Sequence, residues 1–125
     1  MALCVLAHAV GVTVAARRLS IVQAARFSQW VWMFIRLAWL IVLLHLVEIT
    51  LWAFLYLWRE AMPDLQSAVY FSAVTYTTTG YGDLVLPMEW RLVGAVEALT
   101  GILMCGWSTG FFFAAVSRMV QTESR

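Results

Sequence analysis

Two long apolar segments dominate the chain, and a shorter, mixed segment separates them. Residues 31–58 read VWMFIRLAWLIVLLHLVEITLWAFLYLW, in which Arg36 and Glu48 are the charged residues. A helix of this length spans roughly 40 Å, which is enough to cross ~30 Å of hydrocarbon with some tilt. Residues 89–119 form a second long run, interrupted by Thr, Ser and Gly. The pattern therefore predicts two membrane-spanning helices.

The segment between the two runs predicts a short helix followed by an extended stretch. Asp64 follows a proline and suits a helix N-terminus, because its side chain can accept from free backbone N–H groups. Residues 64–77 are too short to cross the membrane and are interpreted as a re-entrant helix. Residues 78–83, TTGYGD, favour extended backbone, since β-branched threonines disfavour helix and Gly80 and Gly82 permit unusual dihedral angles.

The N-terminal segment allows three interpretations. Residues 1–16 are apolar and are followed by Arg17 and Arg18. A signal peptide carries its positive charge before the apolar core rather than after it, and an interfacial helix needs a broader polar face. The third interpretation is a short additional membrane helix, although roughly 24 Å is short for a span. Residues 1–30 are expected to hold an apolar helix and a basic cytoplasmic linker.

Composition indicates that a bilayer is the solvent of this chain. The 125 residues have a mean hydropathy of +0.84, and 12% are charged, about half the ~25% typical of soluble proteins. A net charge of +1 gives no field for binding nucleic acid. The sequence has no Ser-His-Asp set, metal-ligand spacing or phosphate loop, so an enzyme is not expected. Cys4 and Cys105 are interpreted as small core residues.

Arginine placement predicts the orientation in the membrane. Arginines precede or open the first long helix and close the second, whereas the loop between the helices has more acidic than basic residues. Because an Arg excess marks the cytoplasmic side, residues 78–83 are expected to face outward. We therefore expect a multi-pass protein of the plasma membrane, with residues 120–125 as a short cytoplasmic tail. The flanking arginines are Arg17, Arg18, Arg26, Arg36, Arg118 and Arg125.

The 78–83 stretch also has the chemistry to hold a cation. Extended backbone at membrane depth persists only where protein buries it or where it lines a watery path. Rings of backbone carbonyl oxygens can replace the hydration shell of a cation, and threonine hydroxyls offer further oxygens. The C-terminal end of the preceding short helix carries partial negative charge, which favours a cation nearby. The stretch therefore predicts cation passage.

Residues 78–83 closely resemble the selectivity-filter signature Thr-Val/Ile-Gly-Tyr-Gly-Asp of potassium channels. Over residues 31–119, the order of segments is similar to the two-helix pore module of that family. The resemblance implies an all-α membrane protein with an outer helix (31–58), a pore helix (64–77), a filter (78–83) and an inner helix (89–119). It also implies a potassium-selective channel in which three identical subunits complete each oxygen ring, giving a homotetramer surrounded by lipid. No cofactor is expected beyond the K⁺ ions in the filter.

The resemblance assigns roles to individual residues. The ion-binding filter would consist of Thr78, Thr79, Gly80, Tyr81 and Gly82, with K⁺ held at the first four. Asp83 would support the filter from behind, but this chain has Val74 where some relatives have a glutamate that pairs with this acid. Asp83 therefore needs another partner, such as an aromatic N–H or O–H group or water. Thr79 replaces the usual Val or Ile, and its side chain is expected to point toward the pore helix, with selectivity retained.

Several residues inside the apolar runs are candidates for structural or regulatory roles. Gly101 aligns with the inner-helix hinge glycine of such channels, and its alternative role is close helix packing. His45 and Glu48 share one helix face, Glu97 lies one turn before Gly101, and His8 is a further candidate for the same layer. Ionisable groups inside a membrane are costly and indicate a partner or a function. They are interpreted either as a pH-responsive network that braces the filter or as a hydrogen-bonded cluster that fixes helix packing.

Two alternatives to a potassium-selective channel stay open at this point. Thr79 suggests a non-selective cation channel, because it departs from the usual signature. A non-conducting auxiliary membrane subunit would have the same pattern of helices. A repeat of a larger transporter is disfavoured, since the Gly-Tyr-Gly motif is intact in a single copy.

Overall fold

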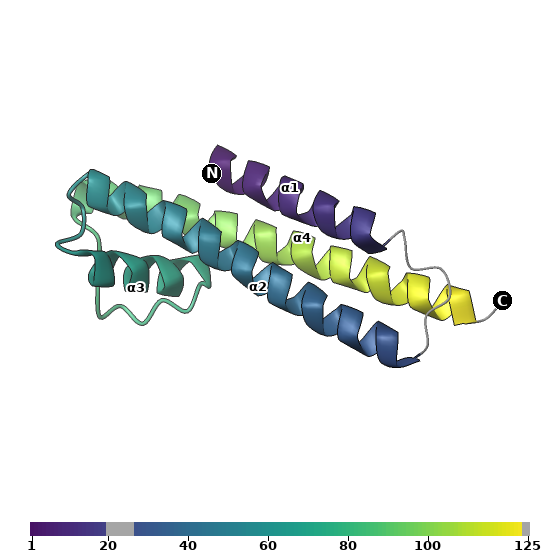
Figure 1. Cartoon of the computed structure of the whole chain (residues 1–125). Helices are drawn as coiled ribbons and strands as arrows, with labels where there is room; N and C mark the ends of the chain where they lie inside the picture. Colours follow the sequence, from purple (N-terminus) through teal and green to yellow (C-terminus); the bar gives the residue numbers. More distant parts are fainter. Residues whose placement is uncertain (20–26, 124–125) are drawn as a thin grey trace.

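The computed structural model describes residues 1–19 and 27–123. Its helices are α1 (Ala2–Leu19), α2 (Phe27–Trp58), α3 (Leu65–Tyr76) and α4 (Arg91–Glu123), with the short 3₁₀ turn η1 (Met88–Trp90) leading into α4. The long helices α2 and α4 lie side by side, α1 packs against both, and α3 lies with its loops at one end of the bundle (Figure 1). The predicted all-α fold, with a short helix between two long apolar ones, is confirmed. Arg26 and Arg125, which were expected on the cytoplasmic side, lie outside the described residues.

Two stretches are long and apolar enough to cross a membrane. They are Ser28–Trp58 and Met88–Arg118, with mean hydropathies of 2.2 and 1.6. Helix α2 begins at Phe27, before its predicted start at residue 31. Helix α4 begins at Arg91, after its predicted start at residue 89, because the 3₁₀ turn η1 precedes it. Apolar side chains on α2, such as Trp39 at 64% exposure, face outward, as expected for a helix that meets lipid or another subunit. Helix α1 is apolar but shorter, and its crossing of the membrane stays a prediction.

Helix α3 begins and ends where its sequence predicts. Asp64 has extended backbone, and its two carboxylate oxygens accept from the backbone N–H of Ser67 at 2.8 Å and from the Ser67 hydroxyl at 2.9 Å. These bonds lower the pKa of Asp64, so the carboxylate stays charged at the positive end of the helix dipole. At the other end, the N–H of Thr77 returns to the carbonyl of Ala73. The predicted range, 64–77, thus contains the helix and both of its caps.

The main core forms where α3 packs between α2 and α4. Tyr56 from α2 is fully buried and meets Phe71 from α3 edge-on, with ring centroids 5.4 Å apart. Leu86, in the segment that leads to η1, closes the same cluster. A smaller cluster of Ala15, Leu37 and Ala115 joins α1, α2 and α4 away from α3. The long helices are therefore held together at two levels, and α3 contributes to only one of them.

Gly101 allows α4 to touch the end of α3 directly. A Cβ atom at this position would collide with the carbonyl oxygen of Tyr76, and the Tyr76 Cα would lie 3.2 Å away. Such a contact involves backbone atoms, so it cannot be relieved by rotating a side chain. Close packing therefore accounts for this glycine, and its role as a hinge stays a prediction.

The substitution Gly101→Ala is expected to lower the free energy of unfolding by about 1–3 kcal/mol, because α3 and α4 must separate to admit the methyl group. Gly106→Ala is the matched control on the same helix, since nothing lies within 4 Å of its Cβ position. Denaturant titrations of both variants in detergent micelles measure the difference. Equal stability of the two variants would contradict the contact between Gly101 and Tyr76.

Candidate functional site

The stretch after α3 turns its backbone N–H groups back toward that helix. The N–H of Thr78 donates to the carbonyl of Thr75 at 2.9 Å. The N–H groups of Thr79 and Gly80 both donate to the carbonyl of Val74, at 2.9 and 3.3 Å. These bonds satisfy carbonyls at the C-terminal end of α3 that would otherwise lack partners. The backbone N–H groups of Thr78, Thr79 and Gly80 therefore donate to α3.

The carbonyl groups of the same stretch are left without such partners. Within the described part of the chain, no hydrogen bond reaches the carbonyls of residues 78–81. Gly80 and Gly82 have φ of +56° and +76°, in the region that favours glycine. Nothing lies within 4 Å of a Cβ at either position, so the dihedral angle rather than space requires glycine there. Residues 78–81, here called the strip, thus have free carbonyl acceptors, while the N–H donors of Thr78, Thr79 and Gly80 are bonded to α3.

Thr78, the first residue of the expected filter, has a strained backbone conformation that the sequence does not predict. Its φ is +58°, which a β-branched residue adopts only at a cost of about 1–3 kcal/mol. Thr77, one residue earlier, still has helical dihedral angles, so the chain leaves the helix abruptly at Thr78. The N–H bonds to α3 hold this conformation in place.

The Thr79 hydroxyl is bonded within the chain. The Thr77 hydroxyl donates to the carbonyl of Ala73 at 2.7 Å, so its single proton is used there. Thr79 Oγ1 lies 2.9 Å from Thr77 Oγ1 and is therefore the donor of that pair. The hydroxyl that distinguishes Thr79 from Val thus contacts the end of α3.

Asp83 accepts a hydrogen bond from a tyrosine on α3. Tyr70 on α3 donates its hydroxyl to Asp83 Oδ2 at 2.6 Å, and the N–H of Leu84 donates to Oδ1 at 3.1 Å. The Tyr70 bond lowers the pKa of Asp83, which keeps this carboxylate ionised at neutral pH. Because residue 74 is Val and not Glu, Asp83 was expected to need another partner, such as an aromatic O–H group. Tyr70 is that partner.

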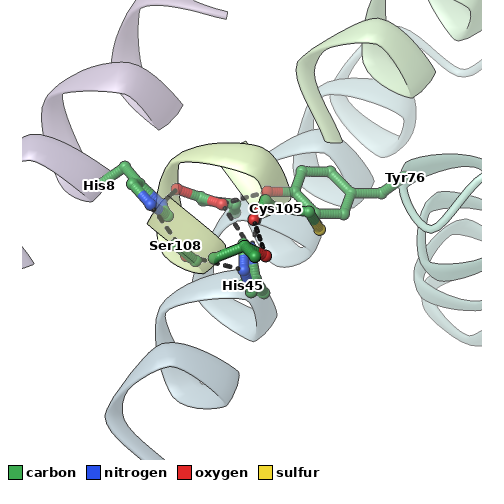
Figure 2. A network of polar contacts seen from close by, with 7 residues as sticks. His8, His45, Tyr76, Cys105 and Ser108 are labelled. Atoms are coloured by element: carbon green, nitrogen blue, oxygen red, sulfur yellow. Dashed lines mark hydrogen bonds and ion pairs between the residues drawn. The ribbon is translucent and has the colours of Figure 1, made fainter. Parts of the chain in front are cut away.

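The structure divides the ionisable residues of the long helices into two clusters. The first, here called the histidine cluster, consists of His8, His45, Glu48, Tyr76 and Ser108; Figure 2 labels all of them except Glu48. Glu48 is central: its Oε1 lies 2.9 Å from His8 Nδ1, its Oε2 lies 3.2 Å from His45 Nδ1, and Tyr76 donates to Oε2. Ser108 on α4 contacts both imidazole rings. One cluster therefore joins all four helices.

Glu97 belongs to a second, separate cluster. The Tyr56 hydroxyl donates to Glu97 Oε2 at 2.7 Å, and Ser72 Oγ contacts Oε1. Ser72 also donates to the carbonyl of Ile49 at 2.8 Å. Since a hydroxyl has one proton and a carbonyl has none, every partner is satisfied when Glu97 carries a proton and donates it to Ser72. A neutral acid is also the form that a membrane interior favours.

The sequence indicates the buried acids but not most of their partners. His8 was named only as a candidate, although Cys4, His8 and Ala15 are buried at helical spacing along α1. That spacing is the sequence feature that marks His8 as facing the bundle. Ser108 lies 100 residues from His8, and nothing local to either residue predicts their contact.

Two long apolar helices with a short helix and a strip of free carbonyls between them are consistent with the pore domain of an ion channel. A family model described as an ion channel matches residues 40–118, which is more than half of the chain, and the protein belongs to this family. It is accordingly a membrane protein with two candidate spans rather than an enzyme. No match was found among curated proteins or among solved structures.

Replacing Glu97 tests whether its carboxyl group is protonated. Glu97→Gln is expected to leave the free energy of unfolding nearly unchanged, because the amide N–H₂ donates to Ser72 and the amide oxygen accepts from Tyr56. Glu97→Ala is expected to lower it by about 1–3 kcal/mol, since the Tyr56 hydroxyl then stays unpaired in the core. Glu89→Ala, at an exposed glutamate, is the control. A Gln variant as unstable as the Ala variant would show that the carboxyl group is ionised.

Removing the Tyr70 hydroxyl is expected to raise the pKa of Asp83. In Tyr70→Phe, this pKa should move toward the ordinary value of about 3.9. In the unaltered chain, the bond stabilises the fold above the unfolded-state pKa of Asp83, and this stabilisation is lost as pH falls through the lowered native pKa. The stability of Tyr70→Phe should therefore fall less over the same pH range. Carboxyl ¹³C shifts of Asp-labelled protein measure the change.

Asp64 and Asp83 are the two aspartates of the chain, so both carboxyl signals can be followed in one labelled sample. Asp64 is the internal control, because Ser67 lowers its pKa independently of Tyr70. An unchanged Asp83 titration in the Phe variant would exclude the bond in solution.

Proposed function

We propose that this protein is a potassium-selective channel that lets K⁺ pass the membrane down its electrochemical gradient. The observation that carries the proposal is the polarity of this stretch: the N–H groups of Thr78, Thr79 and Gly80 are bonded to α3, and the carbonyls of residues 78–81 stay free. A strip with this polarity can present its oxygens to an ion along its whole length. The TTGYGD motif at the same residues resembles the potassium channel filter.

A monovalent ion fits this strip better than a divalent one. Calcium and magnesium sites in proteins are built largely from carboxylates. The acid that follows the strip, Asp83, is held by Tyr70 and Leu84. Neutral carbonyl dipoles therefore supply the ligands, and these suit a dehydrated monovalent cation.

Four copies of the chain are needed for such a site. A single strip offers oxygens from one side, and in the isolated chain Tyr81 is 72% exposed, so nothing encloses an ion there. The α4 face that carries Ile102, Cys105 and Thr109 is also exposed and provides a surface for the pore or for neighbouring subunits. We place the homotetramer in the plasma membrane, with the filter mouth outside.

The alternative of a non-selective cation channel rests on Thr79, and the contacts of this residue argue against it. Its hydroxyl donates to Thr77 at the end of α3, so it does not offer an extra oxygen on the ion side. Thr79 then occupies the place of Val with a similar shape. The alternative of a non-conducting subunit is left to experiment.

Ion flux into liposomes that contain the purified protein tests the function. Potassium uptake is expected, with sodium taken up far more slowly. Thr79→Val is expected to keep this preference, and Gly80→Ala to abolish uptake, because alanine at φ +56° is strained. Equal rates for the two ions would favour the non-selective channel, and absence of flux would favour the auxiliary subunit.

A further inference from the structure

Three side chains that ligate metals converge in the histidine cluster. His8 comes from α1, and His45 and Glu48 come from α2. One ligand atom from each lies within 4.8 Å of the other two. His8 and Glu48 are fully buried, and both imidazole rings contact the Glu48 carboxylate. Figure 2 shows His8 and His45 on either side of Ser108.

Ser108 determines where the imidazole protons lie. Its Oγ is 3.1 Å from His8 Nε2 and 3.2 Å from His45 Nε2. A hydroxyl has one proton, so at least one of two neutral rings must donate through Nε2 to Ser108. That ring then presents the lone pair of its Nδ1 to the Glu48 carboxylate, which is also a lone-pair donor. His45 Nδ1 also lies 3.0 Å from the Tyr76 hydroxyl. A proton or a metal ion between the facing lone pairs would relieve their repulsion.

We propose that His8, His45 and Glu48 form a binding site for a divalent transition metal ion of the zinc class. Imidazole nitrogen and carboxylate oxygen bind Zn²⁺ at about 2.0–2.2 Å, which places tetrahedral ligand atoms roughly 3.3 Å apart. The two His–Glu separations, 2.9 and 3.2 Å, are close to this value. The remaining spread, up to 4.8 Å, closes by rotation of the side chains.

The donor set selects the class of ion. Calcium and magnesium prefer oxygen ligands throughout, whereas two imidazoles with one carboxylate suit zinc, cobalt, nickel and copper. Ser108 provides the outer contact that metal-bound histidines usually have on their second nitrogen. The His45 side chain is 17% exposed and leaves a route by which the ion can enter.

A metal at this site would fasten α1 to the pore domain. His8 is the ligand from α1, and Tyr76, which donates to Glu48, lies at the end of α3 close to Thr78. The site is thus one contact away from the strip of free carbonyls. Metal binding itself does not depend on potassium conduction, so the two proposals can fail separately.

Cobalt titration of the purified full chain in detergent tests the site directly. After chelator treatment, Co²⁺ is expected to give visible d–d absorption that saturates at about one ion per chain and is displaced by Zn²⁺. The band should be lost in His8→Ala and in Glu48→Gln. Ser108→Ala should weaken cobalt binding roughly 10- to 100-fold, because the rings lose their shared partner.

Two controls separate this site from other ligands. The double variant Cys4→Ser, Cys105→Ser should bind Co²⁺ as the unaltered chain does, because the thiols are not ligands in the proposal. Glu97→Gln should also bind normally, since Glu97 lies in the other cluster. His8→Ala leaves every residue of the channel domain, 40–118, unchanged. Absence of cobalt absorption in the unaltered chain, undiminished binding in His8→Ala, or loss in the cysteine variant would overturn the proposal.

Discussion

The hydrogen bonds between the strip and the end of α3 are the constraint on which the site depends. Three consecutive N–H groups, from Thr78 to Gly80, donate to the carbonyls of Val74 and Thr75. They satisfy the helix terminus, hold Thr78 in a strained conformation and leave the strip's own carbonyls free. Since the strip has no sheet partner in the described chain, its shape is determined by the position of α3. Every contact that fixes α3 therefore also fixes the strip.

Polar contacts set the depth of α3 in the bundle. Inside a membrane, apolar side chains are about as well accommodated by lipid as by protein, so apolar contacts alone give a weak preference for one position. Directional bonds supply the preference: Ser72 contacts Glu97 on α4, and Tyr76 donates to Glu48 on α2. Gly101 sets the closest approach of α4 to the same helix end. The contacts that Glu48 and Glu97 make with α3 thus account for the presence of these buried acids, whether or not they also regulate the protein.

The fold was predictable because its determinants are local. The length of the apolar runs predicted the two long helices, and Asp64 predicted the start of α3. Gly80 and Gly82 predicted the positions with positive φ in the segment that follows. The positive φ of Thr78 was not predictable, because a β-branched residue rarely adopts it and here it accompanies N–H groups that fold back onto the end of α3. The grouping of the ionisable residues was unpredictable because its contacts are distant in sequence: His45 and Glu48 share a helix face, but their partners His8 and Ser108 lie on two other helices. Glu97, which was grouped with them as an ionisable residue inside the apolar runs, bonds instead to Tyr56 and Ser72.

The same contacts determine which acidic groups lie near the strip. Asp83 is ionised and accepts from Tyr70, while Glu48 and Glu97 are bonded to Tyr76 and Ser72 on α3 and not to the strip. No carboxylate among the described residues is bonded into residues 78–82, so the field along the strip comes from dipoles. Dipoles attract a cation strongly enough to replace its water but lack the full charge that would trap it. If the acids act on conduction, they do so by moving α3, and Tyr76 is the residue through which Glu48 would reach Thr78.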